Sequence, residues 1–178
     1  MITKRALYRL FRNGIIVLLI FIVLMEAVLW SLHFDDRLTF ITQSGGFVSY
    51  LGSLVRNTLL PEMMTVFSLA IMIYTTRHWF KIRLIDLTGK ALSIYQLSFL
   101  PTLLVAFVVC IPFTQSVRYL LTEFAAYSFD TYWNTYIIGS YSWTMYFRYL
   151  FFILLIGYSM LNISLATDFS TSRVLPLN

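Results

Sequence analysis

The chain has 178 residues, of which 59% are hydrophobic and only 12% are charged, and its mean hydropathy is +0.77. Soluble globular domains are about one-quarter charged, so this composition excludes an ordinary soluble domain and is typical of an integral membrane protein. The net charge of +5 comes mainly from basic residues beside the apolar runs, so we take it as a topology signal and expect no nucleic-acid partner.

Four apolar stretches are each long enough to cross a bilayer, which needs roughly 20 mostly apolar residues. They cover residues 14–32, 58–76, 91–113 and 141–163. A basic flank, residues 1–13, comes before the first stretch, and a polar tail that we expect to be extended, residues 164–178, follows the last. The sequence therefore predicts an all-α, polytopic membrane protein with four transmembrane helices in one compact bundle.

Two longer loops, residues 33–57 and 114–140, separate the first span from the second and the third span from the fourth. The first loop contains a Ser-Gly-Gly turn followed by apolar residues at helical spacing from Phe47, and the second has a similar set that begins at Val117. Such a pattern in a short polar segment is typical of an amphipathic helix at a membrane surface. We expect one short interfacial helix in each loop.

Two residues are expected to shape the spans. Pro101 lies in the middle of the third span. It removes a backbone donor and is expected to kink that helix, which requires neighbours that satisfy the freed carbonyl. Gly157 in the fourth span has no side chain and indicates a close approach to another helix.

Aromatic residues mark the predicted membrane borders. We expect interfacial positions for Trp30, Trp79, Trp133, Tyr141 and Trp143. The amphipathic rings of Trp and Tyr prefer the level of the lipid headgroups. The alternative for the aromatic-rich run at residues 127–143 is a cage for a sugar or a cation.

Basic residues are distributed unevenly between the segments that flank the spans. Segments 1–13, 77–90 and 164–178 carry nine Lys or Arg in all, whereas segments 33–57 and 114–140 carry three. Cytoplasmic loops are enriched in Lys and Arg. We therefore expect a multi-pass protein of the cell membrane with both termini cytoplasmic and both long loops outside.

Three charged residues, Glu26, Glu62 and Arg148, lie inside the predicted spans. Counting from the outer ends of the spans places them about 9, 6 and 10 Å deep, in one layer. A charge in the bilayer costs roughly 3 kcal/mol on insertion scales, and pairing offsets part of that cost. We predict an intramembrane charge cluster in which Arg148 pairs with Glu26 or Glu62. Two alternatives stay open: each side chain extends to the headgroups, or the charges form a ligand or proton site.

Sequence motifs for catalysis or cofactor binding are missing. The chain has no HExxH, CxxC, Walker or GxGxxG pattern, so we predict no enzyme activity, no cofactor and no metal site. We expect a solvated loop at His33, Asp35 and Asp36, and a weak cation site is the alternative.

We therefore expect a non-catalytic membrane module that serves as an anchor, a sensor or input domain, or a small subunit of a larger assembly. Its partners would be the lipid bilayer and other membrane subunits or further copies of itself. One alternative is a small oligomeric transporter or channel that uses Glu26, Glu62 and Arg148. The other is a membrane enzyme that acts on lipid.

Overall fold

The computed structural model describes residues 4–82, 88–139 and 143–174, and every regular element in that part of the chain is helical. The elements are α1 (Lys4–Leu32), α2 (Phe34–Gln43), α3 (Phe47–Leu54), η1 (Val55–Leu59), α4 (Leu60–Trp79), α5 (Gly89–Arg118), η2 (Tyr119–Glu123), α6 (Phe129–Tyr132), η3 (Trp133–Ile138) and α7 (Trp143–Val174). The η elements are wide, π-helical turns that continue a neighbouring α-helix.

Among the described residues, four helices are long and apolar enough to cross a membrane, the number that the sequence predicts. They cover Ala6–Leu32, Phe47–Trp79, Gly89–Glu123 and Phe147–Thr167. The second and third are 33 and 35 residues long, because α3 and η1 lead directly into α4 and η2 continues α5. The second and third predicted spans, residues 58–76 and 91–113, were therefore inner parts of longer helices.

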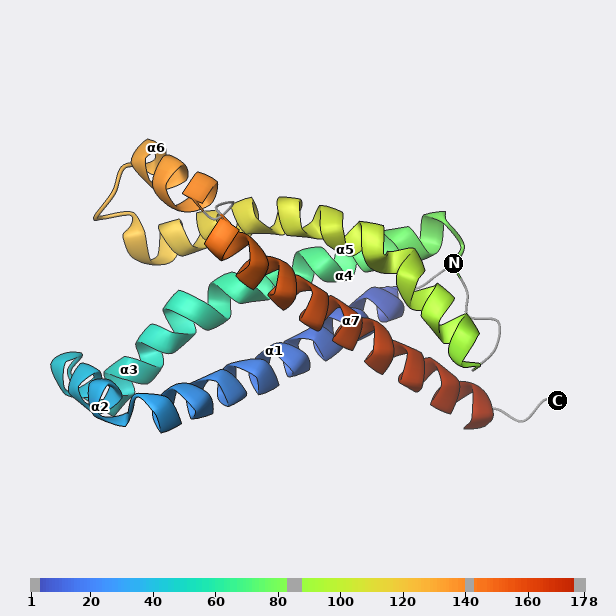
Figure 1. Cartoon of the computed structure of the whole chain (residues 1–178), viewed down its shortest axis with the longest axis horizontal. Helices are drawn as coiled ribbons and strands as arrows, with labels where there is room; N and C mark the ends of the chain where they lie inside the picture. Colours follow the sequence, from blue (N-terminus) through green and yellow to red (C-terminus); the bar gives the residue numbers. More distant parts are fainter. Residues whose placement is uncertain (1–3, 83–87, 140–142, 175–178) are drawn as a thin grey trace.

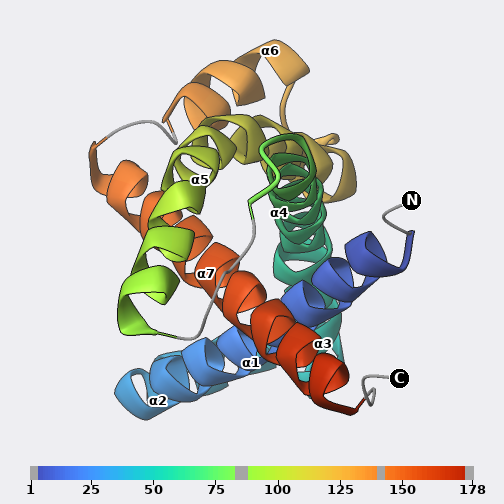
Figure 2. The same ribbon diagram turned by 90° about the vertical axis from the view of Figure 1, so that its right-hand side faces the viewer.

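The four long helices run alternately in opposite directions (Figure 1). The start of α1 and the end of α7 lie at one end of the bundle, which we call the terminal end, together with the end of α4 and the start of α5. The short elements α2, α3 and α6 lie at the opposite end, which we call the cap end. In the view along the bundle, α7 crosses α1, and α4 and α5 lie to one side of that crossing (Figure 2).

The two long loops are largely helical, as the spacing of their apolar residues predicts. The first holds α2, α3 and η1, and the second holds η2, α6 and η3. The expectation of an extended tail is wrong as far as Val174, because α7 continues to that residue. Serine and threonine lower helix propensity only slightly, and the Thr167 hydroxyl bonds back to the Ile163 carbonyl at 2.8 Å.

Buried side chains from α1, α4, α5 and α7 form the main core. Its fully enclosed members include Leu18, Leu69, Phe99, Leu103 and Ile156. A smaller apolar cluster at the cap end contains Tyr119, Tyr132 and Ile137. The cap end therefore has its own apolar packing. A hydrogen bond from Tyr132 to Gln115 joins it to α5.

Two glycines let the long helices approach closely. A Cβ on Gly14 would lie 2.5 Å from Val66 Cγ1 and 2.9 Å from Met160 Sδ, so α1 meets both α4 and α7 there. A Cβ on Gly157 would lie 2.5 Å from Leu103 Cδ2, which confirms the close approach predicted for that glycine. Sequence reasoning did not single out Gly14.

Pro101 lies inside α5, which is one continuous helix that bends between its two ends (Figure 1). The adjacent Thr102 hydroxyl shares a 2.9 Å hydrogen bond with the Thr76 hydroxyl of α4. A neighbouring helix thus provides a polar contact beside the predicted kink.

The aromatic residues predicted at the borders differ in their surroundings. Trp30 is half-buried and packs edge-on against Phe34 at 5.8 Å between ring centroids. Trp79, at the end of α4, is largely exposed, and Trp133, in η3, is partly exposed. Tyr141 and the side chain of Trp143 lie outside the described residues.

Candidate functional site

Glu62 is buried near the start of α4, immediately after an irregular stretch of helix. Pro61 has no N–H, and its ring crowds the carbonyl four residues earlier, at Asn57. The wide turn η1, which spans Val55–Leu59, lies where the backbone has to accommodate that crowding. This local geometry allows one helix to continue past Pro61 and to direct the Glu62 carboxylate into the bundle.

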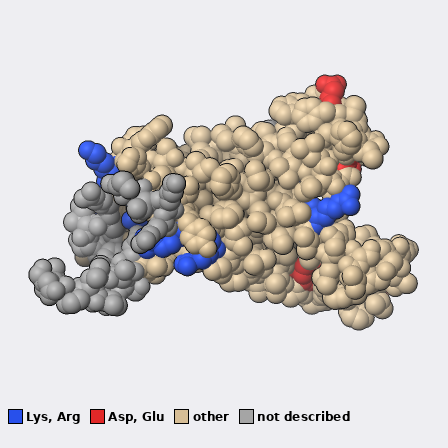
Figure 3. Space-filling model, turned by 180° about the vertical axis from the view of Figure 1, so that it is seen from behind, with Lys and Arg blue, Asp and Glu red and all other residues tan. Residues whose placement is uncertain are grey.

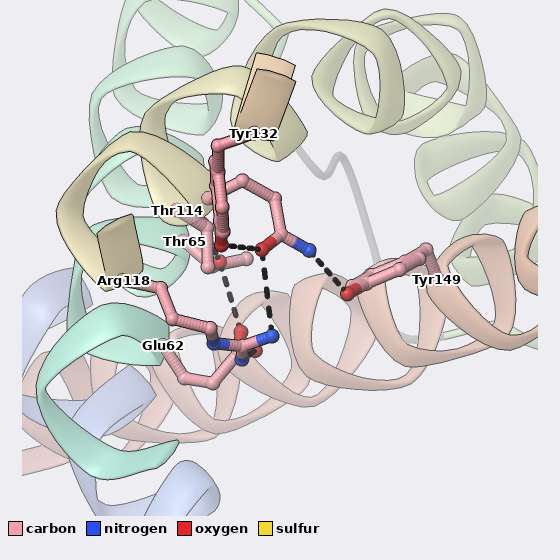
Figure 4. Close-up of polar contacts among 7 residues, drawn as sticks. Glu62, Thr65, Thr114, Arg118, Tyr132 and Tyr149 are labelled. Atoms are coloured by element: carbon pink, nitrogen blue, oxygen red, sulfur yellow. Dashed lines mark hydrogen bonds and ion pairs between the residues drawn. The ribbon is translucent and has the colours of Figure 1, made fainter. Parts of the chain in front are cut away.

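The Glu62 carboxylate has partners on two helices (Figure 4). Oε1 lies 3.4 Å from Nη2 of Arg118, at the end of α5. Oε2 accepts a 3.0 Å hydrogen bond from the hydroxyl of Thr65, one turn along α4. The Thr65 hydroxyl is also 2.5 Å from the hydroxyl of Thr114 on α5. Buried polar groups are therefore paired with one another across the α4–α5 contact.

Gln115 is the branch point of these interactions. Its side chain is buried, and Nε2 donates to the hydroxyl of Tyr149 on α7 at 2.7 Å. Its Oε1 accepts from the hydroxyl of Tyr132 on α6 at 3.2 Å and from Nη1 of Arg118 at 3.5 Å. We call Glu62, Thr65, Thr114, Gln115, Arg118, Tyr132 and Tyr149 the polar network; it links α4, α5, α6 and α7.

Tyr132 brings the cap end into this network. Its ring is fully enclosed, tilted against Tyr119 and stacked on Tyr136. Burial raises the pKa of the Tyr132 phenol, although the positive charge of Arg118 opposes the effect. The phenol therefore keeps its proton at neutral pH and remains a donor to Gln115.

A second polar cluster surrounds Glu26 at the cap end. The Tyr50 hydroxyl of α3 donates to Glu26 Oε2, and Arg37 of α2 donates to the same hydroxyl at 3.2 Å. Arg37 Nη1 also lies 3.8 Å from Glu26 Oε2. The Glu26 side chain is more exposed than that of Glu62, and the cluster joins the hairpin of α2 and α3 to the end of α1.

The structure does not bring the three predicted charges together. Glu26 pairs with Arg37 and Glu62 pairs with Arg118, and neither carboxylate forms an ion pair with Arg148, which is exposed on α7. Both actual partners lie in segments that the sequence assigned to loops. For Arg118, helical spacing was the one signal in the sequence. If the third span extends past residue 113, Arg118 lies one turn after Thr114 and Gln115, on the same face of the helix.

A small cavity adjoins the polar network. It is lined by Thr65, Cys110, Ile111, Thr114, Tyr149, Phe152 and Ile153. About 10 Å³ of it is open to the centre of a water molecule, which is room for about one water, and its lining is mostly apolar. In the polar network, Arg118 Nε is a buried donor that has no hydrogen-bond partner within the described ranges.

The predicted lack of a metal site stays a prediction. Within residues 4–82, 88–139 and 143–174, no group of three or more His, Cys, Asp or Glu side chains is arranged to hold a metal ion. His33 lies 3.7 Å from Asp36, one turn away on an exposed surface. No protein-family model, curated protein or solved structure matches the chain.

Proposed function

We propose that the chain is a multi-pass membrane protein with both termini in the cytoplasm and the cap end outside. Four helices of spanning length support insertion. The distribution of charge supports the orientation, because segments 1–13, 77–90 and 164–178 of the sequence hold nine of the thirteen Lys and Arg residues. On the face drawn in Figure 3, most of the blue surface lies toward the terminal end and the red surface toward the cap end.

Within that membrane, we infer a non-catalytic module that acts as an input domain or small subunit of a larger assembly. The observation that carries this proposal is the pair of hydrogen bonds at Gln115, one to Tyr132 of the cap and one to Tyr149 of α7. The polar side chains in the interior bond mainly to one another, which favours a structural and coupling role over a site that receives a substrate.

The geometry of α7 suits such coupling. The helix has 32 residues, so it is about 48 Å long, well over the roughly 30 Å of a bilayer core. It begins near the cap and continues to Val174, past the end of its candidate membrane span at Thr167. Movement of the cap would strain the contact from Tyr132 through Gln115 to Tyr149, and a rigid α7 would carry that displacement to the cytoplasmic side.

The assembly test measures the mass of the protein extracted with its surrounding lipid. The full chain is expressed at low level, extracted into polymer-bounded native nanodiscs, and its stoichiometry is determined by light scattering and quantitative mass spectrometry. The proposal predicts a defined complex heavier than the 20.8 kDa chain, either a homo-oligomer or a complex with a partner in fixed ratio. A monomer with no stoichiometric partner contradicts it.

One observation favours the alternative of a small oligomeric transporter or channel. The Glu62–Arg118 pair lies within candidate spans, and Thr65, which donates to Glu62, lines a cavity with room for a water. Ionisable groups at such positions often mark ion or proton paths. Liposomes containing a pH-sensitive dye or Na⁺ and K⁺ indicators separate the two functions. Flux that appears with the wild type and is lost in Glu62→Gln, with Glu26→Gln as the comparison, would favour transport over the module.

A further inference from the structure

One apolar face of α1 is packed near the terminal end and uncovered near the cap end. Leu10, Gly14, Leu18, Phe21, Met25, Val28 and Leu32 follow at spacings of three or four residues and therefore share that face. Leu10 and Leu18 are 4% and 0% exposed, whereas Met25, Val28 and Leu32 are 43%, 50% and 70% exposed. The apolar face by which α1 packs into the core therefore continues beyond the core toward the cap end.

The face becomes uncovered because α1 and α7 diverge. Phe21 and Phe152 are in edge-on contact, with ring centroids 5.2 Å apart. Toward the cap end, the two helices separate in both ribbon views (Figures 1 and 2). One turn beyond this contact lie Met25 on α1 and Arg148 on α7, both exposed and each on the same face of its helix as the phenylalanine.

Arg148 gives a positive charge to the exposed surface that it forms with Met25, Val28 and Leu32, which we call the α1–α7 surface. The carboxylates Glu26 and Glu62 are paired with Arg37 and Arg118, so neither neutralises it. Arg148 lies five residues after the start of α7, which is about 8 Å along the helix axis. A guanidinium at that depth reaches the phosphate level of the leaflet, and phosphate is a favoured bidentate partner of arginine.

We propose that the α1–α7 surface binds one phospholipid of the outer leaflet. The headgroup phosphate pairs with Arg148, and an acyl chain lies along Met25, Val28 and Leu32. The phosphate offsets the charge of Arg148 in the membrane. The acyl chain covers the apolar face of α1 near the cap end, where α7 no longer packs against it. This inference rests on the proposed membrane insertion and specifies a ligand for that surface.

The test counts bound lipid by native mass spectrometry of the full chain in detergent. Phosphatidylglycerol, phosphatidylcholine and a galactosyl diacylglycerol with the same acyl chains are titrated separately, and inorganic phosphate is added as a competitor. Three variants are compared with the wild type: Arg148→Gln, Arg148→Lys, and Lys90→Gln. The last removes the same charge from an exposed site at the terminal end. Each protein is first recovered from carbonate-washed membranes, so a loss of insertion is seen separately.

The proposal predicts that one molecule of either phospholipid binds and that the galactolipid binds much more weakly. Arg148→Gln is expected to weaken phospholipid binding about tenfold, the scale of one lost charge-assisted contact. Arg148→Lys should keep most of the affinity and Lys90→Gln should match the wild type. Equal binding by Arg148→Gln and the wild type overturns the site while leaving membrane insertion intact. Displacement by inorganic phosphate, or a change in oligomeric mass in place of lipid loss, overturns the choice of a lipid.

Discussion

Replacement of Gln115 by leucine tests whether the polar network holds the cap and α7 to the bundle. The two side chains are similar in size, so Gln115→Leu mainly removes polar atoms. It eliminates the bonds to Tyr149 at 2.7 Å, Tyr132 at 3.2 Å and Arg118 at 3.5 Å. It also leaves the enclosed Tyr132 hydroxyl without that acceptor.

The expected loss follows from these contacts. Hydrogen bonds between membrane helices contribute on average about 0.6 kcal/mol each, and two of the three, to Tyr149 and Tyr132, join α5 to another helix, so they contribute roughly 1 kcal/mol. A buried hydroxyl left unpaired costs about 1–3 kcal/mol, and leucine recovers part of this through better apolar burial. We expect Gln115→Leu to lower the free energy of unfolding by about 1–3 kcal/mol.

The assay is reversible unfolding in mixed micelles with increasing dodecyl sulfate, followed by circular dichroism. Gln96→Leu is the matched control, because Gln96 also lies on α5 and bonds to α7, through a single exposed 2.9 Å contact with Asn162. That variant should lose less than about 1 kcal/mol. Equal destabilisation by the two variants would refute the claim that the network is a main support of the bundle.

Three further predictions concern the ion pairs, the helix contacts and the cap. Glu62→Gln removes a buried carboxylate from its pair with Arg118 and should destabilise by about 2–3 kcal/mol, whereas Glu26→Gln removes a more exposed carboxylate and should cost about 1 kcal/mol or less; the same micelle titration measures both, and the reverse order would count against the assigned pairs. Gly14→Ala should destabilise by about 1–2 kcal/mol, because overpacking outweighs the gain in helix propensity. Gly52→Ala, where nothing lies within 4 Å of the new Cβ, should be neutral or stabilising, and equal melting temperatures for the two would contradict the close approach at Gly14. Tyr132→Phe should speed amide exchange in α6 and η3 about fivefold, the effect of about 1 kcal/mol, whereas Tyr136→Phe, at an exposed phenol, should change it little; exchange measured by mass spectrometry in nanodiscs decides between them.

The four long helices could be predicted because each contains an apolar run that only a membrane span or a buried helix explains. Their full lengths could not, because the apolar spacing in residues 47–59 and 114–123 predicted separate interfacial helices rather than extensions of the spans. That error hid Arg118 as a partner, and Arg37 on α2 was likewise counted as a loop charge, so Arg148 was the one arginine left inside a predicted span.

The aromatic members of the two polar clusters were equally hard to find. Tyr50, Tyr132 and Tyr149 belong to a set of 12 tyrosines in a chain that is 18% aromatic, so composition does not distinguish a buried donor from a headgroup contact. Gln115 was equally hard to identify, because a single amide side chain in a predicted loop forms no pattern that indicates burial. The close helix approach at Gly157 was predictable because this glycine lies inside a predicted span. The same argument also holds for Gly14, at the edge of the first span.

Cysteine labelling in intact cells tests the arrangement of the chain in the membrane most directly. In a Cys110→Ala background, single exposed positions are changed at both ends of the bundle: Asp35→Cys and Asp130→Cys at the cap end, and Lys90→Cys at the terminal end. A membrane-impermeant maleimide should label the first two variants in intact cells and the third only after permeabilisation. Labelling of Lys90→Cys in intact cells, or recovery of the protein in the soluble fraction, would contradict a four-span module with its cap outside.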